Sequence, residues 1–324
     1  MSALPVHVLT GFLGSGKTTL LARLLREPAL ADTAVVINEL GEVGLDHVLV
    51  DRGPEDDVVL LDSGCLCCAL GNSLQETLES LYFRRERKAL PAFARVVIET
   101  TGVADPGPIA ATLALDSAIA RHYRLGSIVT VVDAVNAVTH LDRFEEARRQ
   151  VAVADRLVVS KRDLADAAPI ETRLRSLNPH AARDGAVFVD AQAGRAPAPG
   201  THDHQGHDHL AEHGIATISL RFSEPLTWAR YADFVQWSQR TLGERLLRMK
   251  GAVRMEDGEA RALHGVLRLF SAPQGLAALP ASLGCGAVVL VTQDAGADEL
   301  AEARRRLLGD TSIHACTLPT FRTK

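Results

Sequence analysis

The side chains best suited to chemistry come early in the chain, in the run Gly11-Phe12-Leu13-Gly14-Ser15-Gly16-Lys17-Thr18-Thr19. The order is glycine, four residues, then Gly-Lys-Thr, which is the phosphate-binding P-loop pattern. Backbone N–H groups at a helix start bind polyphosphate, the lysine reaches the outer phosphates, and the threonine hydroxyl can ligate Mg²⁺. Strand-like residues 6–9 precede the run and leucines at helical spacing follow it, which argues against a mere glycine-rich turn. The predicted phosphate-binding residues are Gly11, Gly14, Ser15, Gly16, Lys17, Thr18 and Thr19.

Acidic residues after two later strands could complete this site. The apolar run at residues 95–98 ends in Glu99, and Gly102 follows three residues later. An acid at a strand tip can hold Mg²⁺ or its water, and a glycine amide can sense the γ-phosphate; the alternative is a strand that happens to end in glutamate. Glu39, after the apolar run 34–37, could also meet the Mg²⁺, unless its loop is only a solvated acidic segment. We predict Lys17 and Glu99 as catalytic residues and Thr18, Glu39 and Glu99 as magnesium ligands.

A third motif follows the apolar residues 156–159. Ser160-Lys161-Arg162-Asp163 resembles the guanine-recognition motif that is usually written Asn-Lys-x-Asp. In that motif the aspartate accepts two hydrogen bonds that guanine offers and adenine cannot, and the lysine stem packs along the purine. Ser160 departs from the pattern and removes an amide contact, but the discriminating Asp163 is present. We therefore expect GTP as the nucleotide, with Ser160, Lys161 and Asp163 at its base.

Three thiols offer a second kind of chemistry. Cys65, Cys67 and Cys68 fall within four positions, just after the apolar run 58–61. Thiolates favour Zn²⁺, Cu(I) and related ions, and three ligands leave one coordination position open, which suits a site that gives its metal away. The alternatives are cysteines buried as small apolar residues, or a redox pair, which is disfavoured because a disulfide between adjacent cysteines is strained. The isolated cysteines, Cys285 and Cys316, are expected to be structural.

A low-complexity stretch at residues 195–214 interrupts the apolar patterning. It cannot build a core, so we expect a linker or an exposed loop. Two His-x-His pairs with aspartates in this stretch can bind divalent metals weakly, and a merely hydrophilic linker is the alternative. The candidate auxiliary ligands are His202, His204, His207 and His209.

These motifs need a sheet that brings strand ends together. Short apolar runs of strand character alternate with helical patterns, which favours an α/β fold with a mostly parallel sheet covered by helices. Such sheets bind ligands outside the carboxyl ends of their strands, where the motifs above lie. The expected strands are residues 6–9, 34–37, 58–61, 95–99, 127–133, 156–159 and 186–189.

The pattern changes at about residue 215 to that of a smaller α+β domain. Alternation at residues 217–222 indicates a half-exposed strand, and an aromatic stripe from Trp228 to Leu242 indicates a helix. Further strands are expected at 246–249, 264–270 and 287–292, and a last helix at 298–308. The expected domains are residues 1–194 and 215–324, joined by the histidine-rich linker 195–214.

Length and composition narrow the classes of function. The 324 residues are 47% hydrophobic and 23% charged, which is ordinary for a soluble globular protein of two domains. The net charge of −5 gives no electrostatic reason to expect nucleic acid or an anionic membrane as partner. No apolar run approaches the roughly 20 residues that span a bilayer, and the N-terminus lacks a signal-peptide pattern. We therefore expect a cytoplasmic protein without nucleic-acid or membrane partners.

Taken together, the motifs resemble those of the CobW-type P-loop GTPases. The likeness covers the P-loop, residues 38–42, Gly64-Cys65-Leu66-Cys67-Cys68, residues 99–106 and, in the second domain, Arg248-Met249-Lys250-Gly251. The resemblance implies a P-loop GTPase sheet and a GTP-driven metallochaperone, with zinc as the commonest cargo and cobalt or iron in some branches. It also implies that the three cysteines are the transfer site, that the histidines are an auxiliary site, and that a client metalloprotein is the partner. A homodimer that depends on nucleotide or metal is an open alternative.

The two kinds of chemistry can be joined in one mechanism. We expect GTP with Mg²⁺ to order segments 38–46 and 62–68 into a metal-holding form, and hydrolysis to loosen them. The two states must differ by about 5.5 kcal/mol in metal affinity to move occupancy from mostly bound to mostly free. Turnover should be slow, because the motifs supply no arginine for the triphosphate. Two other functions fit the motifs: a P-loop kinase or ATPase with structural cysteines, or a passive metal store with vestigial nucleotide binding.

Overall fold

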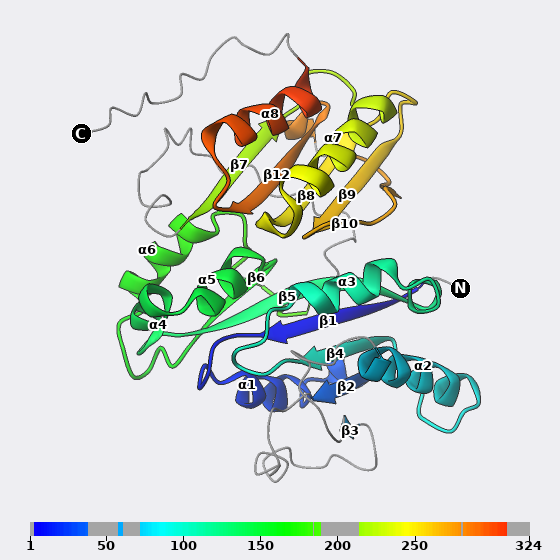
Figure 1. Ribbon diagram of the computed structural model, residues 1–324. Helices are drawn as coiled ribbons and strands as arrows, with labels where there is room; N and C mark the ends of the chain where they lie inside the picture. Colours follow the sequence, from blue (N-terminus) through cyan, green and yellow to red (C-terminus); the bar gives the residue numbers. More distant parts are fainter. Residues whose placement is uncertain are drawn as a thin grey trace. The chain divides into compact units, whose positions relative to one another are not determined.

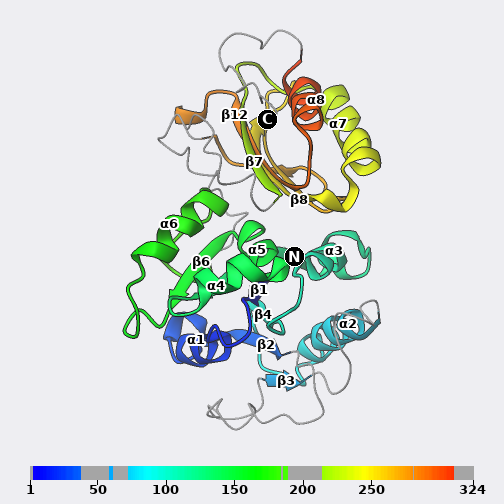
Figure 2. The same cartoon turned by 60° about the vertical axis from the view of Figure 1, so that its left-hand side comes forward.

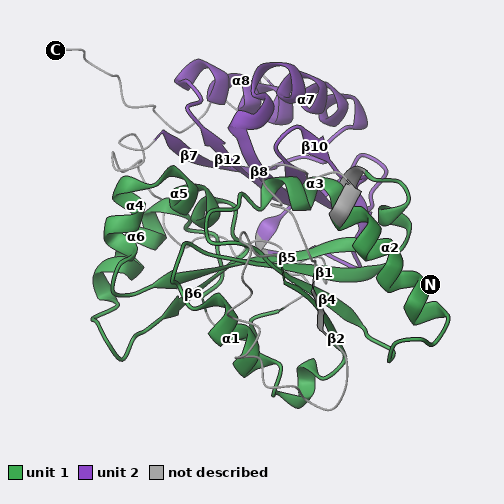
Figure 3. Ribbon diagram, turned by 60° about the horizontal axis from the view of Figure 1, so that its bottom comes forward, with its two compact units in different colours: residues 1–193 green, residues 194–324 purple. Residues whose placement is uncertain are grey.

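The computed structural model describes residues 3–37, 58–60, 72–183, 185–188, 214–279 and 281–309. The chain divides into two compact units, residues 1–193 and 194–324 (Figure 3). Each unit contains its own six-stranded sheet. Within the described ranges, no helix combines the length and apolarity that a bilayer crossing requires.

The sheet of the first unit is parallel throughout, with strand order β3-β2-β4-β1-β5-β6 (Figure 1). The strands are β1 (Leu4–Thr10), β2 (Thr33–Ile37), β3 (Val58–Leu60), β4 (Arg95–Glu99), β5 (Tyr123–Asp133) and β6 (Arg156–Ser160). Because all are parallel, their carboxyl ends lie at one edge of the sheet. The register there places Leu9 beside Glu99, Glu99 beside Ile37, and Ile37 beside Leu60.

Helices cover both faces of this sheet, as two neighbouring residues of β5 show. The helices are α1 (Lys17–Leu24), α2 (Asn72–Glu86), α3 (Gly107–Leu115), α4 (Ala137–Arg143), α5 (Glu145–Ala152) and α6 (Ala168–Leu177), with 3₁₀ turns at Pro28–Leu30 and Ile119–Arg121. Val131 shares a core with the α1 leucines, whereas Val132 shares another with residues of α4, α5 and α6. Since side chains alternate along a strand, α1 and the α4–α6 group cover opposite faces. The latter three helices contact one another and lie side by side (Figure 2).

The strand expected at residues 186–189 is wrong in the part that the structure describes. Residues 185–188 form no strand, yet Phe188 is buried and packs against the α1 core. In this region the described chain pairs with β6 through an isolated bridge between Arg156 and Ala182. The apolar pattern at residues 186–189 therefore indicates side-chain burial and not the backbone pairing of a strand.

The second unit has an antiparallel sheet with the order β10-β9-β8-β12-β7 and with β11 paired to β9. Its strands are β7 (Ile215–Arg221), β8 (Leu246–Arg254), β9 (Ala260–Val266), β10 (Leu269–Phe270), β11 (Gln274–Gly275) and β12 (Gly286–Gln293). The helices α7 (Trp228–Thr241) and α8 (Ala297–Leu308) contact each other and share a core with the sheet around Phe234, Leu263 and Leu290. Short 3₁₀ turns lie at Gly243–Arg245 and Ala281–Leu283. The predicted fold class, a helix-covered parallel sheet followed by a smaller α+β domain, is thus confirmed.

One expected strand of this unit is two strands. Residues 264–270 were predicted as continuous, but the chain turns back between Val266 and Leu269, which pair with each other. Leu267 has a φ of 54°, in the left-handed region that leucine rarely adopts, and no glycine or proline marks the turn in the sequence. The strand expected at 246–249 is also longer, because Leu246–Arg254 pairs with strands on both sides.

Candidate nucleotide-binding site

The P-loop joins β1 to α1 in a conformation that needs glycine. Gly11 has a φ of 145°, and a Cβ atom there would lie 2.3 Å from the carbonyl oxygen of Val131 on β5. Gly14 and Gly16 also have positive φ values, of 69° and 88°. These three positions let the loop turn tightly at the carboxyl end of β1, against the neighbouring strand.

Lys17, the first residue of α1, lies across its own loop. It is 9% exposed, and its Nζ donates hydrogen bonds to the carbonyl oxygens of Gly11 at 2.8 Å and Phe12 at 3.5 Å. Burial lowers the pKa of the Lys17 ammonium, and the Glu99 carboxylate opposes that shift. Phosphate oxygens can replace the two carbonyls and give this buried charge a stronger partner.

The next residue, Thr18, meets the acid that ends β4. Thr18 Oγ1 donates a 2.6 Å hydrogen bond to Oε1 of Glu99, which is 4% exposed. The two residues are distant in sequence, and the pairing of Leu9 with Glu99 brings them together. A hydroxyl and a carboxylate oxygen at a P-loop are hard donors of the type that Mg²⁺ requires, so these residues fit the ion. The structure thus brings Thr18 into contact with Glu99, directly beside Lys17.

The segment after Glu99 is tied to the P-loop as well. The N–H of Thr100 donates to the carbonyl of Leu9, and its Oγ1 donates to Thr10 Oγ1, both at 2.9 Å. A Cβ atom on Gly102 would lie 2.5 Å from Leu13 Cδ2 and 2.8 Å from its Cα. Gly102 therefore rests directly on the P-loop, where a larger residue would push the two segments apart.

The base motif begins at the end of β6 and is also anchored to the P-loop. Ser160 Oγ donates to the carbonyl of Ser15 at 2.6 Å and approaches the carbonyl of Val132 at 3.4 Å. The serine hydroxyl thus connects the two motifs despite the missing amide. Lys161 has a φ of 54°, and its Nζ forms a 2.8 Å ion pair with Asp133 at the end of β5.

Asp133, the last residue of β5, belongs to the stretch 131–133 that shares the resemblance to the CobW-type GTPases, but it is not among the predicted site residues. It is 2% exposed and accepts hydrogen bonds from Lys161, from the side-chain amide of Asn136 and from the N–H of Val135. Burial alone would raise the pKa of its carboxyl, but these hydrogen bonds outweigh burial and hold the pKa below its usual value. The signal was available, because a carboxylate at the carboxyl end of a buried parallel strand lies at the ligand edge of the sheet.

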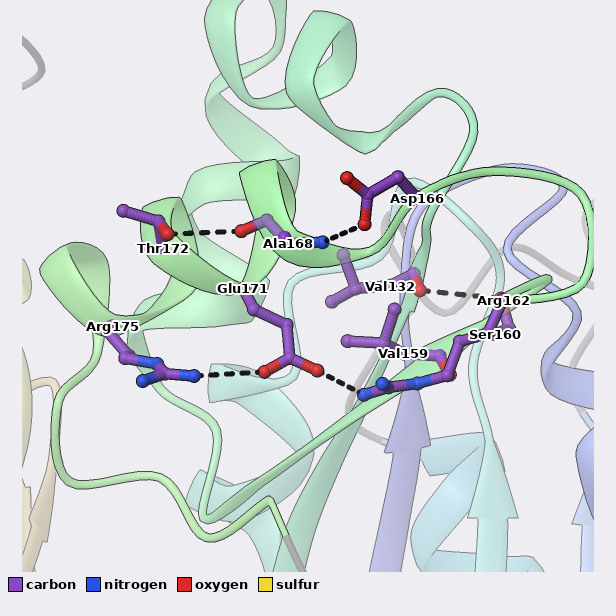
Figure 4. Close-up of polar contacts among 9 residues, drawn as sticks. All are labelled: Val132, Val159, Ser160, Arg162, Asp166, Ala168, Glu171, Thr172 and Arg175. Atoms are coloured by element: carbon purple, nitrogen blue, oxygen red, sulfur yellow. Dashed lines mark hydrogen bonds and ion pairs between the residues drawn. The ribbon is translucent and has the colours of Figure 1, made fainter.

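Figure 4 shows the contacts that connect the base motif to helix α6. Arg162 forms an ion pair with Glu171 of α6, and Arg175 binds the other carboxylate oxygen of Glu171 at 3.1 Å. The hydrogen bond from Arg162 is the main cause that lowers the pKa of the Glu171 carboxyl. Asp166 accepts the N–H of Ala168 at 2.9 Å and fixes the start of α6. Asp163, which lies between Arg162 and Asp166, is exposed and open to a ligand.

Several predicted site residues lie outside the described residues. They are the magnesium candidate Glu39, the metal candidates Cys65, Cys67 and Cys68, and the histidines His202, His204, His207 and His209. Among the described residues, no group of three or more histidine, cysteine, aspartate or glutamate side chains could hold a metal ion. Cys285, which is among the described residues, has a partly buried thiol that packs against the core of the second unit.

These features define a P-loop nucleotide-binding protein with an additional α+β unit. They are the parallel sheet, the P-loop between β1 and α1, the acid at the end of β4 and the base motif that begins at the end of β6. The family model described as the CobW/HypB/UreG nucleotide-binding domain matches residues 5–183. The model of the cobalamin synthesis protein cobW C-terminal domain matches residues 215–308. The chain therefore belongs to the CobW family.

Named relatives agree with this assignment. The chain is 32% identical over 288 residues to the zinc chaperone YjiA of Escherichia coli, covering 84% of this chain and 89% of that protein. It is 39% identical over 170 residues to the zinc-regulated GTPase metalloprotein activator 1 of Schizosaccharomyces pombe, covering 51% of this chain and 40% of that protein. The crystal structure of the Zn(II)-bound YjiA GTPase from E. coli matches with a TM-score of 0.72 at 25% identity, over 94% of this chain and 98% of that one.

Proposed function

We propose that the protein is a GTP-hydrolysing metallochaperone. It binds a transition metal ion, zinc in the first instance, at Cys65, Cys67 and Cys68, and it delivers the ion to a client metalloprotein on nucleotide turnover. The observation that carries the nucleotide half is the contact of Thr18 with Glu99 beside the buried Lys17. The metal half is supported by the cysteine motif and by relatives whose names include zinc chaperone and zinc-regulated GTPase metalloprotein activator.

The side chains around the P-loop support hydrolysis of GTP to GDP and phosphate. Lys17 exchanges the carbonyls of Gly11 and Phe12 for phosphate oxygens, so its charge stabilises the triphosphate as it reacts. Mg²⁺ held by Thr18 and Glu99 would neutralise charge on the phosphates. The Glu99 carboxylate, already fixed by the Thr18 hydroxyl, orients the water that attacks.

Guanine preference is supported by the way the base motif is anchored. Asp163 presents an exposed carboxylate, while its neighbours are fixed: Lys161 by Asp133 and Arg162 by Glu171. A fixed carboxylate can accept the two N–H groups of guanine, and it would leave adenine without a matching pair. Binding of ATP in preference to GTP would instead favour a kinase or ATPase with structural cysteines.

Strand order supports the coupling between nucleotide and metal. Leu60 lies beside Ile37, which lies beside Glu99, and neighbouring strands are about 4.8 Å apart, so Leu60 is roughly 10 Å from Glu99. Cys65 follows Leu60 by five residues, and five residues of extended chain span at most about 18 Å. The chain length between them therefore allows the thiols to lie near the phosphates. Hydrolysis that releases one thiolate from the ion would supply much of the required difference in metal affinity.

The direct test measures zinc affinity, by competition with a chromogenic chelator, in GDP and in a non-hydrolysable GTP analogue. We expect affinity to be higher with the analogue by about 10⁴-fold, the factor that moves occupancy from full to empty. Equal affinities would favour the passive metal store. The variant Cys67→Ser should abolish the nucleotide dependence, whereas the control Cys285→Ser, which changes a thiol of the second unit's core, should retain it.

A further inference from the structure

Helix α5 contains a buried polar side chain that no part of the proposed mechanism uses. Gln150 is 0% exposed, and its Nε2 donates hydrogen bonds to the carbonyl oxygens of Gly102 at 3.2 Å and Ala104 at 2.9 Å. Two carbonyl partners identify this atom as the nitrogen, since the amide oxygen would be repelled there. Both hydrogens of the side-chain amide therefore form hydrogen bonds with the segment that follows Glu99.

The backbone of the same residue is fixed to the sheet. Thr130 Oγ1, on β5, donates a 2.7 Å hydrogen bond to the carbonyl oxygen of Gln150. Thr130 lies beside Thr10, the last residue of β1, in the parallel pairing. The backbone of Gln150 is therefore fixed to β5, the neighbour of the strand that leads into the P-loop, and its side chain reaches from there to Gly102.

A second contact of α5 meets the same segment further along. Arg149 pairs with Asp105 at 3.5 Å and with Glu145, one turn earlier in the helix, at 3.1 Å. The other carboxylate oxygen of Asp105 accepts the N–H of Gly107 at 2.8 Å, at the start of α3. The segment between Glu99 and α3 is thus held by two successive side chains of one helix.

The start of α5 contacts the P-loop itself. The ring of Phe144, which precedes the first turn, stacks on that of Phe12 with centroids 4.7 Å apart and an angle of 28° between the rings. His140 of α4 contacts the same Phe12 ring at 4.7 Å. Helix α5 and the residue before it therefore contact both the P-loop and the Gly102 segment. The contacts of Gln150, Arg149 and Phe144 form without a bound nucleotide.

The hydrogen bonding of Gln150 leaves room for a second arrangement. Its Oε1 is buried and has no hydrogen-bond partner in the described part of the chain. A buried acceptor without a donor is costly, so a shift of the segment that presents an N–H group to Oε1 is favoured over a shift that presents none.

We propose that Gln150 is a positioning residue that holds Gly102 where its amide can meet the γ-phosphate, and so sets the preference for GTP over GDP. This inference rests on the proposed function, because it assumes that the P-loop binds both nucleotides. Gln150 touches no nucleotide in this scheme; it acts through the carbonyls of Gly102 and Ala104. Because Gln150 is part of α5, the inference links the hydrogen-exchange protection of the α5 amides to the position of the Gly102 segment.

The test compares the affinity for a non-hydrolysable GTP analogue with that for GDP, in the full-length protein and in Gln150→Leu. We expect the ratio of the two affinities to fall about tenfold, with GDP affinity changed less than twofold, because two buried hydrogen bonds that position Gly102 are lost. Gln150→Asn, which is shorter by one methylene and cannot reach both carbonyls, should give a smaller fall and keeps the test open if the leucine variant does not fold. Hydrogen exchange adds a second readout: amides of residues 145–152 should differ between the two nucleotides in the wild type and not in Gln150→Leu.

A matched control separates positioning from stability. Tyr123→Phe removes a different buried hydrogen bond of the same unit, from the Tyr123 hydroxyl to the carbonyl of Leu78 at 3.0 Å. Tyr123 begins β5 beside Leu4, at the end of the strands opposite the P-loop, so this variant should lower the melting temperature and keep the affinity ratio. If Gln150→Leu lowers both affinities equally, or leaves the ratio unchanged while the wild type discriminates, the inference is overturned and the proposed function stands. A wild type that binds the GTP analogue and GDP equally would also overturn the inference, whereas the proposed function is overturned by equal zinc affinities in the two nucleotides.

Discussion

Ser160 allows a quantitative prediction, because it stands where related base motifs have asparagine and yet bonds to the P-loop. Its hydroxyl donates a 2.6 Å hydrogen bond to the carbonyl of Ser15, a residue that is 2% exposed. The second acceptor, the carbonyl of Val132, is 3.4 Å away and contributes less. In Ser160→Ala the Ser15 carbonyl loses its donor in a place with little access to water. Leaving a buried acceptor unpaired costs about 1 to 2 kcal/mol.

That cost falls on the loop that wraps the phosphates, so the affinities for GTP and GDP should fall together. Since 1.4 kcal/mol is a factor of ten, we expect a reduction of about 5- to 30-fold for each nucleotide. The ratio of GTP to ATP affinity should not change, because Asp163 is untouched. Titration with a fluorescent nucleotide analogue, with ATP and GTP as competitors, measures both quantities.

Two further variants make the test specific. Asp163→Ala should lower the ratio of GTP to ATP affinity, whereas Ser160→Ala should lower affinity alone. Thr172→Ala removes a hydroxyl from the adjacent helix α6, where it bonds only within the helix at 3.1 Å, and should leave affinity unchanged. The reasoning is refuted if Ser160→Ala binds GTP within twofold of the wild type, or if it changes the GTP to ATP ratio.

Three other predictions follow from the site. Glu99→Gln keeps an acceptor for its hydroxyl partner but loses the charge, so the rate of GTP hydrolysis at saturating GTP and Mg²⁺, measured as phosphate release, should fall by at least about 100-fold; a loss below threefold contradicts the assigned role. Gly11→Ala would place a Cβ atom 2.3 Å from the Val131 carbonyl at a φ of 145°, and it should destabilise the first unit by about 3 kcal/mol, seen as a melting temperature lower by roughly 10 °C; a shift below 2 °C would be inconsistent with this geometry. The pKa of Asp133 is lower in the folded protein than in the unfolded chain, so its stabilisation is present above the ordinary aspartate pKa of about 3.9 and is lost as pH falls through the lowered value. Asp133→Asn should thus cost stability at pH 6 and progressively less below about pH 4, and a pH-independent difference in the free energy of unfolding by urea would argue against it.

The sequence alone was sufficient to place a motif at the end of a strand wherever the motif directly follows an apolar run. The P-loop, Glu99 and the Ser160–Asp163 motif each follow an apolar run, and parallel strands bring their carboxyl ends to one edge. Sequence could not supply the contacts made across the sheet. That Ser160 binds Ser15, or that Thr18 binds Glu99, depends on strand order, which no local pattern contains.

The misses have separate physical causes. Within the apolar run 186–189, the described side chains of Val187 and Phe188 pack against a core without strand pairing, and burial without pairing has the same composition as a buried strand. The turn at Leu267 lacks the glycine, asparagine or proline that usually marks one, so residues 264–270 read as continuous. The sequence could not indicate the role of Gln150, because a glutamine in an amphipathic helix can face either water or the core, and only the structure shows that it is buried.

Among the described residues, β6 is the last strand at one end of the nucleotide-binding sheet, and on its outer side it makes one isolated bridge, between Arg156 and Ala182. The carbonyl of Ser160 accepts the N–H of Ala134, towards β5, so the carbonyl of the preceding Val159 faces the open side. Arg162 Nε donates to that carbonyl at 3.3 Å, and the N–H of Leu157 is already taken by Ala182. An extended segment from another molecule would find two groups on this side of β6 occupied, the N–H of Leu157 and the carbonyl of Val159, and a guanidinium charge in its path. The arginine that steadies the base motif thereby also protects the sheet from edge-to-edge aggregation.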